Sequence, residues 1–113
     1  MTLHHPSAEQ IRLEDVLAAM GHPVRMQILR TLAQAGECTC NAVPLEISKS
    51  TATHHWRVLR EAGVIHQRPA GRTMLTTLRR DELEARFPGL LDVVLGPCTP
   101  RSEPAVAAAG AAR

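Results

Sequence analysis

Residues 48–65 carry the strongest local folding signal of the chain, a capped amphipathic helix with a defined end. Ser48 or Ser50 can accept a hydrogen bond from a backbone N–H of the first helical turn, and Gly63 suits the left-handed position after the last turn. Apolar side chains recur between them at the spacing of a buried helix face, at Ala52, Trp56 and Leu59. The run therefore predicts one helix with an apolar side and an exposed polar side.

The polar side of this helix is basic and is concentrated in its N-terminal half. It carries Lys49, Ser50, Thr53, His54 and Arg57. Helix-turn-helix proteins present side chains from this part of their second helix to base edges and phosphates in the major groove. His54 and His55 point about 100° apart on a helix, so we expect His54 to face DNA and His55 to support the packing.

Charge along the chain points to the same region. Residues 48–80 hold seven Lys or Arg and one acidic residue, whereas each flank is net acidic and the whole chain is only +2. A basic segment of this kind suits a polyanion. Trp56 and Phe87 are the only aromatic residues of types Phe, Trp and Tyr, so stacking platforms for single strands are missing and duplex DNA is the favoured nucleic acid.

Two helices are predicted before this run and a third, short one beside it. Residues 8–20 have a helical apolar stripe that ends at Gly21, and the stripe holds Leu13, Val16, Leu17 and Met20. Residues 23–35 form the second helix, which begins at a proline and ends at a glycine, with His22 serving its start. A short, irregular helix is expected between Cys40 and Leu45 because Pro44 interrupts it.

A hairpin and two short helices are predicted after Gly63. Residues 64–68 and 72–78 are β-prone runs joined by Pro69-Ala70-Gly71. Arg68 and Arg72 flank that turn, as expected of a hairpin that contacts phosphates or the adjacent minor groove. Residues 80–95 return to helical spacing, but Pro88-Gly89 should divide them into two helices.

These elements predict a mainly α fold with a small β-hairpin, a winged helix-turn-helix. Residues 1–7 are expected to form a flexible N-terminal arm, residues 8–95 the DNA-binding and dimerisation domain, and residues 96–113 a disordered tail. The chain has no Gly-rich phosphate loop and no Gly-x-Ser-x-Gly elbow, which argues against an enzyme. It has no signal sequence or membrane-length apolar run, which favours the cytoplasm.

The order of these elements and several short motifs resemble the ArsR/SmtB family over residues 10–95. The motifs are Gly-His-Pro-Val-Arg at 21–25, the Cys38-Thr-Cys40 pair, the block from Ser48 to Gly63, and Gly71-Arg72. The resemblance implies a homodimeric winged-helix transcriptional regulator, commonly a repressor released by a metal ion, with dimer contacts from the first and last helices. Many members have Asp where this chain has His22. Some members bind metal through histidines on the last helix, which residues 80–95 lack, so that site is not carried over.

Cys38 and Cys40 are the first candidates for effector chemistry. On an extended entry to the third helix both thiolates face one side and can share a metal at about 2.3 Å per bond. Another ligand is then needed, from His4 or His5 on the arm, from Cys98, or from Glu37. Thiolate with imidazole suits Ni(II), Zn(II) or Co(II), and thiolates alone suit softer ions or As(III). Oxidation with Cys98 is a second use, and packing as small apolar residues is the alternative to both.

The leading functional prediction is a homodimeric regulator that binds duplex DNA at a palindromic operator and responds to a transition-metal ion or to thiol chemistry. Its DNA contacts are assigned to Lys49, Ser50, Thr53, His54, Arg57, Arg68 and Arg72, and its metal ligands to Cys38, Cys40, His4 and His5. The alternative is a winged-helix co-regulator that works mainly through protein interaction and needs a second protein for tight DNA binding.

Overall fold

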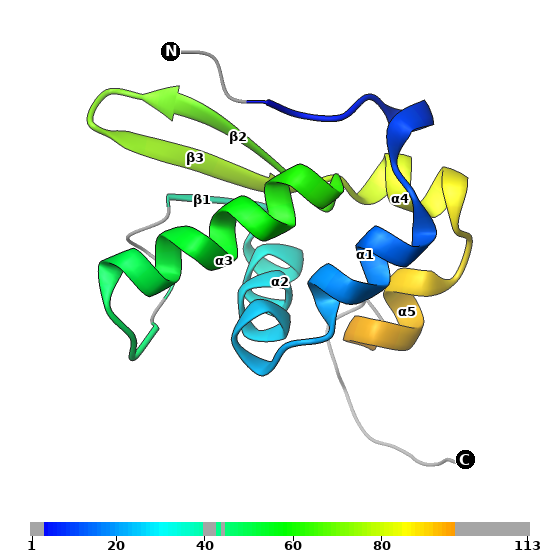
Figure 1. Cartoon of the computed structure of the whole chain (residues 1–113), viewed down its shortest axis with the longest axis horizontal. Helices are drawn as coiled ribbons and strands as arrows, with labels where there is room; N and C mark the ends of the chain where they lie inside the picture. Colours follow the sequence, from blue (N-terminus) through cyan, green and yellow to red (C-terminus); the bar gives the residue numbers. More distant parts are fainter. Residues whose placement is uncertain (1–3, 40–42, 44, 97–113) are drawn as a thin grey trace.

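Helices lie along one side and at one end of a small antiparallel sheet, whose hairpin projects at the other end, in the computed structural model, which describes residues 4–39, 43 and 45–96 (Figure 1). The elements in chain order are the 3₁₀ helix η1 (Ala8–Gln10), α1 (Leu13–Met20), α2 (Pro23–Ala35), β1 (Glu37–Thr39), α3 (Lys49–Ala62), β2 (Ile65–Ala70), β3 (Thr73–Leu78), α4 (Arg80–Arg86) and α5 (Leu90–Leu95). The predicted class, mainly α with a hairpin in winged helix-turn-helix order, is confirmed.

Helix α2 lies at the centre of the core. Pro23 occupies its first turn, where the missing N–H has no helical partner to lose, and the His22 ring accepts a hydrogen bond from the Val24 N–H at 3.1 Å. Ile28, Leu29 and Leu32 are fully buried along one side of the helix. The prediction of a helix over 23–35 with a histidine at its start is confirmed.

The first helix is shorter than the sequence predicts. Residues 8–20 divide into η1 and α1 because the backbone is extended at Ile11 and Arg12, which places the Ile11 side chain in the core. The predicted apolar stripe of this helix is only partly buried. Val16 and Met20 are buried, whereas Leu13 and Leu17 are 42% and 48% exposed. Two leucines on one short helix are therefore left uncovered within a single chain.

The hairpin forms, but its turn lies two residues later than predicted. Strand β2 continues through Pro69 and Ala70, which pair with Met74 and Thr73 of β3, so the turn consists of Gly71 and Arg72. Proline is tolerated there because β2 is an edge strand in the order β1-β3-β2. Arg72 therefore lies in the turn itself, and Arg68 lies on β2.

Strand β1 was not predicted. It pairs antiparallel with β3 from Glu37↔Thr77 to Thr39↔Leu75 and completes the sheet. The short helix expected between Cys40 and Leu45 falls mostly outside the described residues. Its described members, Val43 and Leu45, are not helical.

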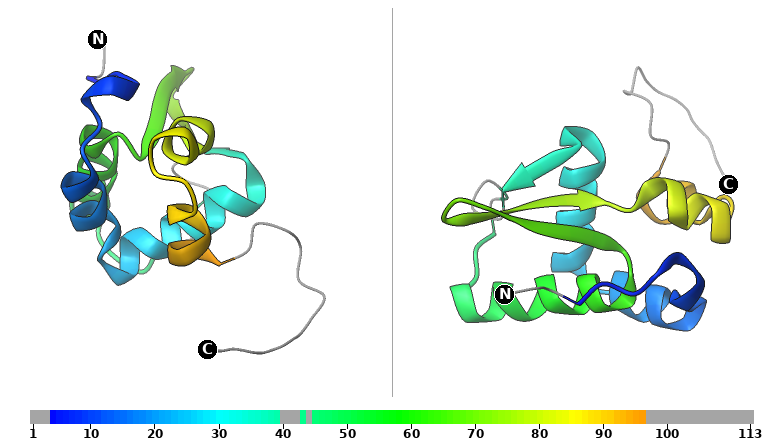
Figure 2. Two further views of the ribbon diagram at one scale, coloured as in Figure 1. Left: turned by 90° about the vertical axis from the view of Figure 1, so that its right-hand side faces the viewer. Right: turned by 90° about the horizontal axis from the view of Figure 1, so that it is seen from above.

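Helices α4 and α5 are separate, as predicted from Pro88-Gly89. Leu83 of α4 and Leu91 of α5 are fully buried, while Val93 of α5 is 83% exposed. The hairpin tip and the N-terminus of α3 lie toward one end of the molecule, and α1, α4 and α5 lie toward the other (Figures 1 and 2). The left view of Figure 2 looks onto this second end.

Residues 4–7, which the sequence assigns to a flexible arm, lie against strand β2. The His5 ring accepts a hydrogen bond from the Gln67 N–H at 3.0 Å and stacks on His66 with the ring centres 4.2 Å apart. Pro6 is buried, and its carbonyl accepts a hydrogen bond from Arg79 at 2.8 Å. These contacts hold the described part of the arm, in contrast to the expected free segment. The predicted tail lies outside the described residues except for Gly96.

Candidate nucleic-acid interface

The candidate interface is built on α3, whose two ends are fixed by the residues that the sequence indicates. The Ser48 hydroxyl accepts a hydrogen bond from the Thr51 N–H at 3.2 Å, and Gly63 ends the helix in the left-handed conformation with φ of 89°. His55, Trp56 and Leu59 are buried on its inner side. The helix is therefore anchored by packing and leaves its other side open.

The open side of α3 carries all five side chains assigned to it from the sequence. Lys49, Ser50, Thr53, His54 and Arg57 are all exposed. The Thr53 hydroxyl donates to the Lys49 carbonyl at 2.9 Å within the helix. This side offers two cations, two hydroxyls and an imidazole from the first half of the helix, a composition that suits phosphates and base edges.

The hairpin contributes two exposed arginines, one of which is already in an ion pair. Arg72 is exposed in the turn, whereas Arg68 forms an ion pair with Glu37 of β1 at 3.3 Å. Both partners of this pair are about half exposed, so the pair is weak and solvent-screened. Breaking the Arg68–Glu37 ion pair therefore costs little free energy, and Arg68 can bind a phosphate in place of Glu37.

Hydrogen bonds hold the hairpin at a set position beside α3. Arg60 of α3 donates to the Gln67 side chain of β2 at 2.9 Å, and Gln67 donates to the Thr76 hydroxyl of β3 at 3.2 Å. A groove of about 700 Å³ lies between helix and hairpin, and Lys49 and Arg57 are among its lining residues. Cations of α3 thus border the space between the two candidate DNA-binding elements.

A cluster of three histidines and an arginine supports the inner side of α3. Arg25 of α2 donates to His55 Nδ1 at 3.0 Å, and the His55 ring lies 4.6 Å from the His22 ring and 5.6 Å from the His54 ring, centre to centre. Burial lowers the pKa of His55, and the neighbouring His22, Arg25 and His54 lower it further. His55 is predicted from the sequence to pack, whereas the only sequence signal for Arg25 is its place in the Gly-His-Pro-Val-Arg motif.

Among the candidate metal ligands that the structure describes, Cys38 and His5 lie toward opposite edges of the sheet. Cys38 of β1 pairs with Thr76 of β3, which in turn pairs with Gln67 of β2, and His5 binds the far edge of β2. Two strand spacings, about 10 Å, therefore separate Cys38 from Gln67 before His5 is reached. His4 is exposed, and Cys40 and Cys98 lie outside the described residues. Within the described part of the chain no group of three His, Cys, Asp or Glu residues could hold a metal ion.

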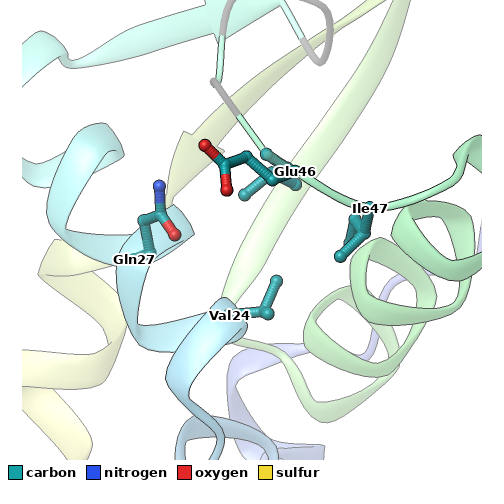
Figure 3. Close-up of a pocket in the computed structure, with 5 residues that line it drawn as sticks. Val24, Gln27, Glu46 and Ile47 are labelled. Carbon is teal, nitrogen blue, oxygen red and sulfur yellow. The ribbon is translucent and has the colours of Figure 1, made fainter.

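A second hollow lies between α2 and the segment that leads into α3 (Figure 3). It is lined by Val24, Gln27, Leu45, Glu46 and Ile47. The Gln27 amide and the Glu46 carboxylate point toward each other across it, and the remaining lining side chains are aliphatic. One carboxylate and one amide are too few strong ligands for a transition metal.

No helix among residues 4–39 and 45–96 is long and apolar enough to cross a membrane.

Comparison with known proteins agrees with this geometry. Residues 20–68 match a family described as a helix-turn-helix domain. The chain is 36% identical over 91 residues to the uncharacterized HTH-type transcriptional regulator YceK of Bacillus subtilis, a match that covers 78% of this chain and 90% of that protein. It is 40% identical over 73 residues to the putative arsenical resistance operon repressor ArsR of Halobacterium salinarum, covering 60% of this chain and 57% of that protein.

Among solved structures, reduced HlyU from Vibrio cholerae is similar, with a TM-score of 0.57 and 30% sequence identity over 71% of this chain and 84% of that one. The relatives are named as transcriptional regulators, and none of these comparisons points to an enzyme. The chain belongs to the ArsR/SmtB family of winged helix-turn-helix transcriptional regulators.

Proposed function

We propose that this regulator binds duplex DNA as a homodimer at a palindromic operator, with α3 in the major groove and the hairpin on the adjacent backbone. The observation that carries the proposal is the exposed outer side of α3, where Lys49, Ser50, Thr53, His54 and Arg57 all face solvent. Arg68 and Arg72 extend the basic character to the hairpin. The direct contacts are assigned to these seven residues.

The dimer is supported by apolar side chains that a single chain leaves uncovered. Leu13 and Leu17 lie one turn apart on α1, and Val93 lies on α5, at the same end of the molecule (Figure 2). Large apolar side chains that stay exposed at one end of a small chain are candidates for burial against a second copy. A twofold axis through this end would place the two α3 helices on the same side of a duplex, about 34 Å apart for half-sites one turn apart.

The dimer prediction is tested with Leu17→Glu, which puts a charge into the proposed contact surface but leaves the chain's own core intact. We expect the wild-type protein to sediment as a dimer and to bind a duplex of its own promoter region with an affinity that falls steeply with salt. Leu17→Glu should sediment as a monomer and lose at least tenfold in affinity, because each half-site then binds alone. Gln34→Glu, which adds the same charge at an exposed position of α2, serves as the control.

A Leu17→Glu protein that stays dimeric would contradict the α1 contact. A wild-type dimer that does not bind the promoter until a second protein is added would instead favour a co-regulator that acts through protein interaction. Sedimentation and fluorescence anisotropy on the same samples separate these outcomes.

Any response to a transition metal or to thiol chemistry is assigned to Cys38 and Cys40, with the further metal ligand from Glu37 or Cys98 rather than from the N-terminal histidines. His5 already accepts a hydrogen bond from the backbone of β2 and lies across the sheet from Cys38. In calorimetric titrations with Ni(II), Zn(II) and Co(II), His4→Ala/His5→Ala should therefore give the wild-type isotherm and Cys38→Ser/Cys40→Ser should not. Loss of metal binding in the histidine variant, or no binding by the wild type, would contradict this assignment.

A further inference from the structure

Arg25 lies where three helices meet. Its Nε donates to the carbonyl of Ala19 at 2.5 Å, and its Nη1 donates to His55 Nδ1 at 3.0 Å. Ala19 is in the last turn of α1, where carbonyls have no partner within the helix. Arg25 itself is in the first turn of α2, and His55 is in the middle of α3. The Arg25 guanidinium therefore links the end of α1 and the start of α2 to α3, the proposed recognition helix.

This link requires His55 to be neutral. A guanidinium can only donate, so His55 Nδ1 must carry a lone pair and any ring proton must be on Nε2. The same reasoning applies to His22, whose Nδ1 accepts from the Val24 N–H at the start of α2. Protonation of either ring converts its acceptor nitrogen into a donor that faces another donor.

We propose that Arg25 is a positioning residue for the recognition helix, and that protonation of His55 releases this restraint and weakens DNA binding. Arg25 does not touch DNA in this account; it sets the angle of α3 against α2 through His55. The outer side chains of α3, which include His54, then meet the groove correctly only while the link is intact. The inference rests on the proposed binding of duplex DNA.

The surroundings of His55 favour its neutral form. The groups that act on its charge are His22 and Arg25 of α2 and His54 of α3, and all of them are basic. Burial and these neighbours hold its pKa below the usual value of 6.5. The folded state therefore binds this proton less readily than the unfolded chain does. The stability that depends on the neutral ring is complete above pH 6.5 and falls as the pH drops from 6.5 to the lowered pKa. In the folded protein the link itself is lost as the pH falls through that lowered pKa.

The test measures promoter affinity by fluorescence anisotropy in Arg25→Gln, Arg25→Lys and His55→Asn, with Arg30→Gln as the control. Arg30 is exposed on the same helix, so its replacement removes an equal charge. We expect Arg25→Gln to lose about tenfold in affinity at pH 7.5 while its circular dichroism remains that of the folded protein. Arg25→Lys should lose nearly as much, because an ammonium lacks the fork that reaches both acceptors.

His55→Asn separates positioning from a purely structural role. Its amide oxygen can replace Nδ1 as the acceptor and cannot be protonated near neutral pH. We expect near wild-type affinity at pH 7.5 and a wild-type to His55→Asn affinity ratio that falls as the pH is lowered through the pKa of His55, which lies below 6.5. His54 and His22 are present in both proteins, so the comparison isolates the contribution of His55.

The outcomes distinguish this inference from the proposed function. If the wild type does not bind duplex DNA, the proposed function fails and the inference fails with it. If the wild type binds and Arg25→Lys or Arg25→Gln binds equally well, the positioning role alone is wrong. An affinity ratio that does not change with pH overturns the role of His55 protonation.

Discussion

Gly63→Ala is expected to lower the free energy of unfolding by about 2–4 kcal/mol, through two independent effects at one position. The backbone at Gly63 has a φ of 89°, a left-handed conformation that side chains other than glycine rarely adopt. An added Cβ would also lie 2.5 Å from Cγ1 and 2.9 Å from Cδ1 of Ile11. Ile11 is 1% exposed and has little room to move, so the clash is not easily relieved.

Gly71→Ala is the matched control, because it introduces the same methyl group without the clash. Gly71 has a φ of 67° in the hairpin turn, and nothing lies within 4 Å of its added Cβ. Only the backbone strain of about 1–2 kcal/mol remains there. Urea unfolding followed by the fluorescence of Trp56, at one protein concentration, compares the two variants with the wild type. A Gly63→Ala variant no less stable than Gly71→Ala would show that Ile11 does not restrict this position.

The close approach of Ile11 to Gly63 also explains why the first helix could not be predicted correctly. The apolar spacing of residues 8–20 is compatible with one continuous helix, and local propensity offers no reason to interrupt it. The interruption follows from a contact between segments distant in sequence, in which the chain straightens so that Ile11 fills the space over Gly63. The interruption of the first helix can therefore be predicted only from how Ile11 packs on Gly63, and not from the local sequence of either segment.

Elements with their own end signals were predicted well. Helices α2 and α3 begin and end within a residue of their predicted bounds because caps and glycine stops act locally. Strand β1 was missed because its three residues are held by pairing with β3, which follows about forty positions later. The predicted hairpin turn is misplaced because proline favours turns, whereas here an edge strand accommodates Pro69.

The exposure of the proposed DNA contacts was easier to predict than the relative positions of the proposed metal ligands, for a similar reason. A helical period decides which side chains of α3 share an open face, and all five predicted residues do so. The relation of Cys38 to His5 depends on the strand order β1-β3-β2, which spacing in the sequence does not specify. The role of Arg25 was equally hidden, because its partners belong to two other helices.

Arg57→Ala has the second large expected effect, this time on affinity rather than on folding. Arg57 is exposed on the outer side of α3, so its truncation should change stability by no more than about 0.5 kcal/mol. A base or phosphate contact of this type contributes about 1–3 kcal/mol, and a homodimer contains it twice. We therefore expect promoter affinity to fall at least tenfold, with a smaller salt dependence if the lost contact is to phosphate.

The most direct test of the central claim, that α3 is the DNA-recognition helix, is a fluorescence anisotropy titration of the promoter duplex with wild type, Arg57→Ala and Arg30→Ala at several salt concentrations. Arg30 is an exposed arginine of α2, so the two variants each lose one positive charge and differ only in where it is lost. The account predicts that Arg57→Ala loses at least tenfold in affinity and that Arg30→Ala binds like the wild type. Equal affinity of Arg57→Ala and the wild type at every salt concentration would contradict it.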